Sequence, residues 1–281
     1  FENLSLKIIN KDNPIINLED IKFANFGYKK NLIIGKIFNK KFRTKIEKDF
    51  NKINFKLLNS GMSANINFDP DQKKSTKSGI FKLRILNTNL KFNFYYDTKE
   101  LKIFNSYFRS KNLSFDNNTV VKLEPFLDLN SEFDIREINT QIFKKINLDQ
   151  LLKEKDIIKK INSKNIISFK SKKFTRNFID ELNLNINLTY GRANYSKNFY
   201  VSDNFFQCDG NINLLEDYPL LFFDCSVNLK DKQKLLKKFS IKTKVKEEDV
   251  KLKVIGNLSI FNKKINFKNI SMNDNYIGSK D

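Results

Sequence analysis

Alternation between apolar and polar residues runs through most of this chain. The clearest stretches are Leu182–Leu188 and Met62–Phe68, in which every second residue is apolar and the residues between are Asn or Ser. Side chains two positions apart share one face of a β-strand, so each stretch predicts a strand with one apolar and one polar face. Such stretches recur about every 8–12 residues, which is typical of an antiparallel meander, sandwich or barrel.

Residues that favour turns separate these stretches. The predicted turns are at Asn59–Gly61, Asp97–Thr98, Asn117–Asn118 and Asn262–Lys263. We expect a first β-strand series over residues 1–145 and a second over residues 183–281. A helical segment and connector over residues 146–182 would join them.

In the predicted helical segment, the spacing between apolar residues becomes longer than two. Between Asn147 and Ile161 the apolar residues follow a helical spacing, and Asn147 with Gln150 resembles a capping box. Its many Lys residues suit either a helix that lies on an anionic membrane or one that caps an end of the sheet, and we favour capping. Two shorter helices are predicted at Arg176–Asp180 and Asp231–Phe239.

The stretch Phe205–Leu229 predicts a β-hairpin with its turn at residues 216–217. A register slip of one residue would send its apolar side chains to opposite faces, so the register is well determined. The expected cross-strand pairs are Phe206 with Val227, Ile212 with Leu221, and Cys208 with Cys225. Directly opposed residues lie within disulfide range. Cys208 and Cys225 would then form a disulfide in an oxidising compartment, or pack as two buried thiols.

The composition excludes several kinds of functional site. The chain has no His, 2 Cys and 8 Gly, and none of the glycines lies in a phosphate-binding motif. Sites that need imidazole are therefore excluded, and two Cys are too few for a zinc finger or an iron–sulfur cluster. Acidic pairs such as Glu247–Glu248 stand beside Lys in expected turns, which is the pattern of solvated loops. We expect no enzyme activity, no cofactor and no metal site.

The net charge of +20 comes from 52 Lys and Arg against 32 Asp and Glu. The basic residues are scattered, and the joint excess of Lys, Asn, Ile and Phe matches what AT-rich codons encode. We therefore expect a solvated basic surface and no nucleic-acid partner, although such a surface also attracts anionic membranes. No apolar run approaches the roughly 18 residues of a membrane-spanning helix. Because the chain starts at Phe1, we expect a fragment, and the sequence leaves open whether a signal peptide or a membrane anchor precedes it.

Several phrases resemble the β-repeat region of AsmA-like proteins. They are Ile186–Tyr195, Phe199–Asp203, Cys208–Ile212 and Val254–Ser271. The last of these makes a strand, a tight polar turn and a returning strand. The resemblance covers residues 183–275 best and residues 1–140 more loosely. AsmA-like proteins belong to a group of bacterial envelope proteins that bridge membranes for lipid, with an inner-membrane anchor and a curved periplasmic β-sheet.

The resemblance implies a mainly β fold: a long, curved antiparallel sheet that forms an apolar groove, with a short helical interruption near the middle. It also implies a non-enzymatic protein of the bacterial periplasm that binds or conducts lipid between membranes and contributes to outer-membrane assembly. Its partners would be phospholipid or another lipid, and the inner membrane through an anchor missing from this fragment. The candidate lining residues are the apolar ones of the second strand series: Leu184, Ile186, Leu188, Phe206, Ile212, Leu214, Leu221, Phe223, Val227, Leu258, Ile260, Ile265 and Phe267.

The same alternation also builds a closed core. The alternative is therefore a structural or protein-binding envelope β-sandwich, in which two apolar faces cover each other. In that case the candidate lining residues are ordinary core residues, and no continuous groove is left for lipid.

Overall fold

The computed structural model describes residues 4–10, 13–27, 30–37, 39–47, 50–70, 75–139, 155–172, 178–242 and 249–278. Strands make up 69% of these residues and belong to one open, mixed sheet of 19 strands. The predicted mainly β fold, built on one long sheet, is confirmed. The chain divides into two compact units, Phe1–Ser114 and Phe115–Asp281.

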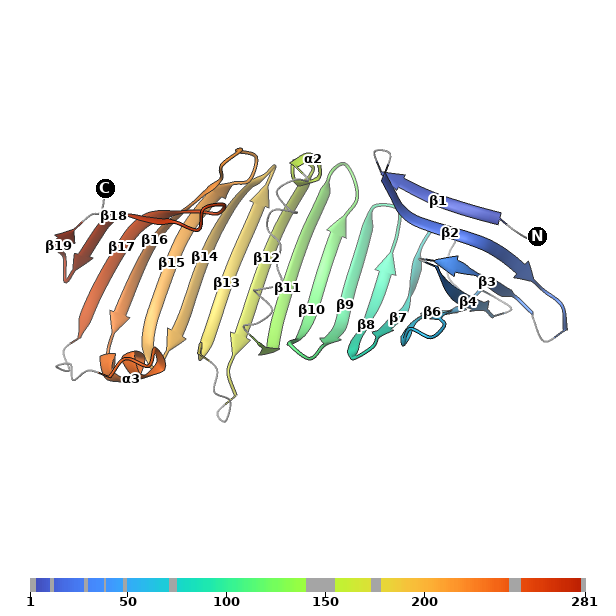
Figure 1. Cartoon of the computed structure of the whole chain (residues 1–281), viewed down its shortest axis with the longest axis horizontal. Helices are drawn as coiled ribbons and strands as arrows, with labels where there is room; N and C mark the ends of the chain where they lie inside the picture. Colours follow the sequence, from blue (N-terminus) through green and yellow to red (C-terminus); the bar gives the residue numbers. More distant parts are fainter. Residues whose placement is uncertain are drawn as a thin grey trace. The chain divides into compact units, whose positions relative to one another are not determined.

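The first unit is an antiparallel series in which each strand pairs with the next one along the chain (Figure 1). Short polar turns suffice for such neighbours. Its strands are β1 (Leu4–Asn10), β2 (Asn13–Ala24), β3 (Leu32–Ile37), β4 (Lys40–Ile46), β5 (Lys52–Leu57), β6 (Met62–Phe68), β7 (Lys77–Ile85), β8 (Thr88–Tyr96) and β9 (Glu100–Arg109).

The second unit holds most of β10 and all later elements. From β12 to β19 each strand again pairs antiparallel with the next. The elements are β10 (Leu113–Lys122), β11 (Leu127–Ile138), α2 (Lys155–Ile158), β12 (Ile161–Lys170), β13 (Glu181–Thr189), β14 (Arg192–Val201), β15 (Asn204–Asn213), β16 (Leu220–Leu229), α3 (Lys232–Lys238), β17 (Val250–Ser259), β18 (Ile265–Met272) and β19 (Asn275–Gly278).

One strand pair departs from the predicted antiparallel order. Strands β11 and β12 run parallel, with Leu127 opposite Ile161 and Ile135 opposite Phe169. Parallel neighbours need a crossover connection of a dozen or more residues, which usually contains a helix. In the sequence, the helical interruption predicted at Asn147–Ile161 falls between these two strands.

Only the end of that predicted helix lies in the described residues, as α2, and the rest falls outside them. Ile158 of α2 is buried, and Lys155 Nζ lies 2.8 Å from Asp217 Oδ1 in the turn between β15 and β16. This turn and the start of β12 are at the same end of the strands. The described part of the crossover therefore runs along an end of the sheet, as the capping alternative predicts.

Helix α3 lies at the opposite end of the strands, where the structure confirms the predicted helix Asp231–Phe239 (Figure 1). The Asp231 carboxylate accepts a hydrogen bond from the Lys234 N–H at 2.8 Å and caps the helix. Lys238 Nζ lies 2.9 Å from Asp180 Oδ1, and the ring of Phe239 packs edge-on against Phe178 at 5.0 Å. These contacts tie α3 to the loop before β13.

The sequence prediction differs from the structure in three further places. Within Arg176–Asp180, residues 176–177 lie outside the described residues, and Phe178–Asp180 form a loop rather than a helix, because the Asp180 carboxylate binds Lys238 instead of a helical backbone. Asn117–Asn118 form no turn but lie inside β10, where Asn117 Nδ2 donates to the Glu132 carbonyl of β11 at 3.0 Å. The turns predicted at Asn59–Gly61, Asp97–Thr98 and Asn262–Lys263 are present.

The third difference concerns the division of the chain. The predicted parts were residues 1–145, 146–182 and 183–281, whereas the compact units meet between Ser114 and Phe115. Pairing explains the difference, since β11 joins β12 and β12 joins β13 along their full lengths. The crossover interrupts the chain but not the sheet.

Candidate functional site

The strand register of the second unit collects apolar side chains on one face of the sheet, which we call the apolar face. The even-numbered residues of Leu182–Leu188 lie on this face of β13, because side chains two positions apart share a face. Antiparallel pairing carries the face across β14 to β17 in rows of cross-strand neighbours. The rows are Leu182, Phe199, Phe206, Val227 and Leu252; Leu184, Lys197, Cys208, Cys225 and Val254; Ile186, Tyr195, Gly210, Phe223 and Gly256; Leu188, Ala193 and Ile212; and Leu221 with Leu258.

The opposite face of the same strands is polar. Asn183, Asn185 and Asn187 are exposed there on β13, and Lys251 and Lys253 on β17. The alternation predicts this arrangement, in which one face of the sheet is polar and exposed to solvent and the other is apolar. The two faces therefore differ in chemistry along the whole series from β13 to β17.

Little of the apolar face is sealed by protein. Most of its side chains are only half-buried, and the fully buried apolar residues among those described are few: Ile21, Leu32, Phe42, Ile158, Phe169, Val201, Cys208, Ile212 and Pro219. The chain exposes 20138 Å² in total. A compact protein of this mass would expose about 12,600 Å², and even two compact globules the size of the two units would expose only about 15,000 Å².

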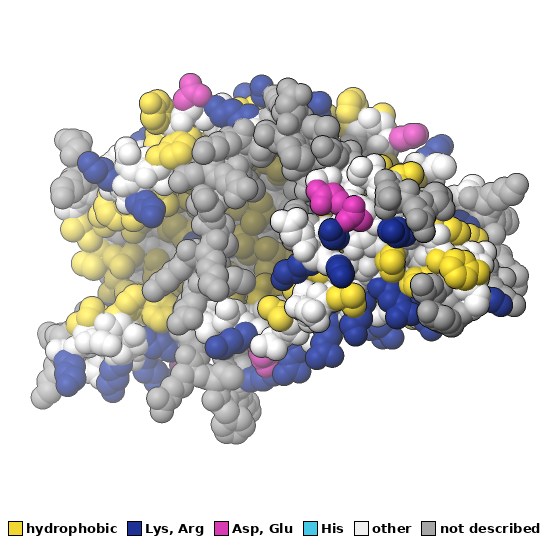
Figure 2. Space-filling view, turned by 45° about the vertical axis from the view of Figure 1, so that its right-hand side comes forward, with side chains coloured by type: hydrophobic (Ala, Val, Ile, Leu, Met, Phe, Trp, Pro, Cys, Tyr) yellow, Lys and Arg dark blue, Asp and Glu magenta, His cyan; other side chains and the backbone are white. Residues whose placement is uncertain are grey.

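A space-filling view agrees with these numbers. Figure 2 shows hydrophobic side chains gathered in a hollow over the strands of the second unit, with Lys and Arg side chains along its margins. Soluble proteins rarely leave a contiguous apolar patch of more than a few hundred Å² without using it for binding. The apolar face is therefore the candidate functional site.

The structure places nearly all of the predicted lining residues on this face. Those of β13, β15, β16, β17 and β18 share it through the strand register, although Ile265 is 52% exposed. Leu214 and Ile260 lie just beyond the ends of β15 and β17. The predictions missed β14, whose side chains on the apolar face include Tyr195 and Lys197. A signal was present in the spacing of Ala193, Tyr195 and Phe199, but the Lys among them obscured it.

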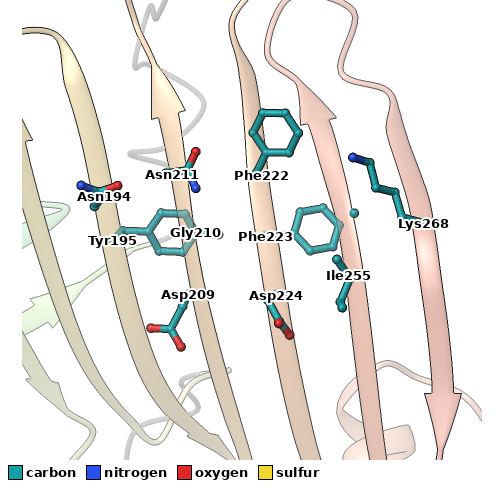
Figure 3. A pocket seen from close by; sticks show the side chains of 11 residues that line it. Asn194, Tyr195, Asp209, Gly210, Asn211, Phe222, Phe223, Asp224, Ile255 and Lys268 are labelled. Atoms are coloured by element: carbon teal, nitrogen blue, oxygen red, sulfur yellow. The ribbon is translucent and has the colours of Figure 1, made fainter.

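Glycine and aromatic residues alternate across five strands in the row that contains Tyr195. Gly210 lies between Tyr195 and Phe223, and Gly256 between Phe223 and Phe267. A Cβ at Gly210 would lie 2.6 Å from the Tyr195 ring, and one at Gly256 would lie 2.7 Å from the Phe223 ring. Figure 3 shows the two rings reaching over the neighbouring strands at these positions. The glycines thus make room for aromatic rings that lie flat on the sheet.

A hollow of about 480 Å³ lies along the same strands, and most of its lining side chains, such as Asp209, Phe222 and Asp224, belong to the polar face (Figure 3). Its lining joins Phe222, Phe223 and Ile255 to polar side chains such as Asp209 and Asp224. Lys268 Nζ lies 5.3 Å from the centre of the Phe222 ring on this wall. The hollow is therefore mixed in character, unlike the apolar face proper.

A disulfide joins two strands in the middle of the apolar face. Cys208 pairs with Cys225 in the predicted register, together with Phe206 and Val227, and the Cα atoms of the two cysteines are 4.1 Å apart. The regular ladder ends at Asn211, one residue before the predicted partner of Leu221. Of the two alternatives for the cysteines, the structure contains the disulfide.

Lys197 is the cation of the apolar face. Pairing places it between Leu184 and Cys208, and its Nζ lies 5.5 Å from the centre of the Phe199 ring. Among the described residues, no carboxylate lies within ion-pair distance of it. Burial lowers the pKa of Lys197. Burial, and to a lesser degree the Asp209 charge, raises the pKa of Tyr195, so its hydroxyl stays protonated at neutral pH.

The first unit has a comparable face of its own. Phe55, Ala64 and Leu83 are cross-strand neighbours on β5, β6 and β7, and their side chains are half-buried. Phe81 stacks on Phe92 with ring centres 4.9 Å apart. The alternation therefore produces the same one-sided sheet in both units.

No family model, no curated protein and no solved structure matches the chain. Within the described ranges, no helix is long and apolar enough to cross a membrane.

Proposed function

We propose that this protein is a non-enzymatic lipid-binding protein that holds acyl chains on the apolar face of its second unit. The observation that carries the proposal is the extent of that face, which runs across β13 to β17 with Lys197 as the one charged side chain in its rows and is only half-buried. Such an area is costly to leave in water and gains free energy when another apolar molecule covers it.

The energetics favour a hydrocarbon chain as the occupant. Each buried CH₂ contributes about 0.8 kcal/mol, so a 16-carbon chain that is half covered gains roughly 6 kcal/mol before the costs of association. Backbone N–H and C=O groups between neighbouring strands are paired in the ladder. The wall therefore offers acyl chains no unpaired backbone groups, which would oppose apolar contact.

Lysines at the strand ends suit anionic headgroups. Lys159 and Lys160 are exposed at one end, before β12, and Lys230 and Lys237 at the other, around α3. A basic residue close to an anionic lipid surface contributes about 1 kcal/mol. A lipid whose chains lie on the apolar face would reach these residues with its headgroup.

The resemblance to AsmA-like proteins extends the proposal to the cellular role of the protein. An AsmA-like protein would work in the bacterial periplasm, anchored to the inner membrane, and would pass phospholipid or another lipid towards the outer membrane. The Cys208–Cys225 disulfide supports an oxidising compartment, since disulfides are rare where thiols are kept reduced. The competing proposal is that a protein partner covers the same face.

Lipid extraction and mass spectrometry of the purified full chain test the proposal. We expect stoichiometric lipid with the wild-type protein. Ile186→Asp, which puts a charge on the apolar face, should lower the lipid content at least about tenfold. Asn187→Asp, one residue along β13 on the exposed polar face, is the matched control and should keep its lipid. A wild-type protein that carries no lipid and takes up none from vesicles would refute lipid binding and favour a protein partner.

A further inference from the structure

The position of Lys197 narrows the kind of lipid that the apolar face can hold, provided that the proposed function is correct. Lys197 lies in the interior of β14, one strand from β13 and three strands from β17, with Leu184 and Cys208 as its cross-strand neighbours. A charged side chain at this position does not favour the binding of a hydrocarbon chain. A cation among apolar side chains pays a desolvation cost, which the Phe199 ring offsets in part and a bound anion would offset further.

The surroundings of Lys197 set the size of that anion. The rows on either side of it, about 7 Å away, are apolar apart from the Tyr195 hydroxyl: one contains Phe199 and Phe206, and the other contains Tyr195 and Gly210. A large zwitterionic headgroup would therefore press its polar atoms against apolar rings. A small headgroup with one negative charge avoids this conflict.

Tyr195 supplies a second polar group on the same face. It is two residues from Lys197 on β14, so both side chains lie on the apolar face with Cα atoms about 7 Å apart. Its hydroxyl can donate a hydrogen bond. Because Gly210 opposite Tyr195 has no side chain, the Tyr195 ring lies over β15 at this position.

We propose that Lys197 and Tyr195 bind the carboxylate of a long-chain fatty acid, whose hydrocarbon tail lies along the neighbouring apolar rows. The ammonium group neutralises the carboxylate, and the tyrosine hydroxyl donates to its second oxygen. The charges balance, because the single positive charge of Lys197 meets a ligand with a single negative charge. The carboxylate contacts would then fix the position of the fatty acid on the apolar face.

The test compares two ligands of equal tail length, oleate and the neutral oleyl alcohol, both below their aggregation concentrations and with the full-length chain. Lys197→Met keeps an unbranched side chain as far as the ε position and removes the charged ammonium group. We expect it to weaken oleate binding about 10- to 100-fold, the size of a charge-assisted hydrogen bond, and to leave oleyl alcohol binding unchanged or tighter. Lys197→Arg should restore most of the oleate affinity.

Lys164→Met is the matched control, because Lys164 is exposed on the polar face of β12. It should change neither affinity more than about twofold. If both ligands bind but Lys197→Met leaves oleate affinity intact, or weakens both ligands equally, the carboxylate site is refuted while lipid binding stands. If lysophosphatidate binds more tightly than oleate and loses more in Lys197→Met, the carboxylate assignment is refuted. If the wild-type chain binds neither oleate nor the alcohol, both proposals fail.

Discussion

Lys197 shows how a single residue can run against the pattern of its own strand. Alternation places it on the apolar face, where burial lowers its pKa below the ordinary value of 10.5. Between the lowered pKa and 10.5 the unfolded chain binds more protons than the folded one, so the free energy of unfolding rises with pH in that window. Below the window the charged form opposes folding.

Removing the charge should therefore stabilise the protein without ligand. We expect Lys197→Met to raise the free energy of unfolding at pH 7 by about 0.5–2 kcal/mol, because the charged group no longer has to leave water. Urea denaturation at pH 7 and at pH 10.5 checks this, and the difference between variant and wild type should shrink at the higher pH. A destabilised variant at pH 7 would mean that Lys197 supports the fold. A residue that weakens the free protein and strengthens its complex is typical of binding sites.

Asn204 illustrates how elements are joined at the margin of the sheet. It is completely buried at the start of β15, and its Nδ2 lies 2.8 Å from the Ser202 carbonyl and 2.9 Å from the Asp231 carbonyl. Its Oδ1 accepts from the Asp231 N–H at 3.0 Å. One amide side chain thus links the β14–β15 turn to the N-cap of α3.

Removing that amide should release α3 and leave buried backbone groups unpaired. We expect Asn204→Ala to lower the free energy of unfolding by about 2–3 kcal/mol and to speed amide hydrogen exchange in α3. Urea denaturation and hydrogen exchange by mass spectrometry measure the two effects. Asn185→Ala, on the exposed polar face of β13, should stay within about 0.5 kcal/mol of wild type. Equal stability of the two variants would contradict the role given to Asn204.

At the scale of the whole molecule, the protein has much strand and little sealed core. Among the residues that the structure describes, few apolar side chains are fully buried, because these residues leave the apolar face of the sheet largely open. Hydrophobic burial in the free chain is correspondingly small, so a ligand that covers the face should contribute an unusually large share of the stability.

A bound lipid should therefore raise the melting temperature. With oleate at about 100 times its dissociation constant, mass action adds about 2.7 kcal/mol to the free energy of unfolding, and the melting temperature should rise by several degrees. Differential scanning calorimetry of the full chain, with and without oleate, measures the shift. Ile186→Asp should show little shift, whereas Asn187→Asp should respond like the wild type. A shift of equal size in all three proteins would indicate binding away from the apolar face.

Local periodicity was enough to predict most of the strands, the two faces and the Cys208–Cys225 pair, but it missed β12, which lies inside the predicted connector of residues 146–182. The hairpin register followed from one turn and from the demand that apolar side chains share a face, and no distant contact was needed. The α3 helix was also predicted from local sequence, because Asp231 supplies the N-cap and the residues after it have the spacing of apolar residues that a helix requires. Asn117–Asn118 misled the prediction because the same side chains that favour turns can donate across a ladder, as Asn117 does to Glu132.

The sequence alone therefore determined where most of the strands form and which side of them is apolar, because a strand's two-residue period is a property of the chain itself. Only the tertiary structure decided that β11 and β12 run parallel across the crossover, that Lys197 lies among apolar rows, and that the described residues leave the apolar face largely open. Each of these depends on which strands lie side by side and on what covers them, and those are relations between residues far apart in the chain.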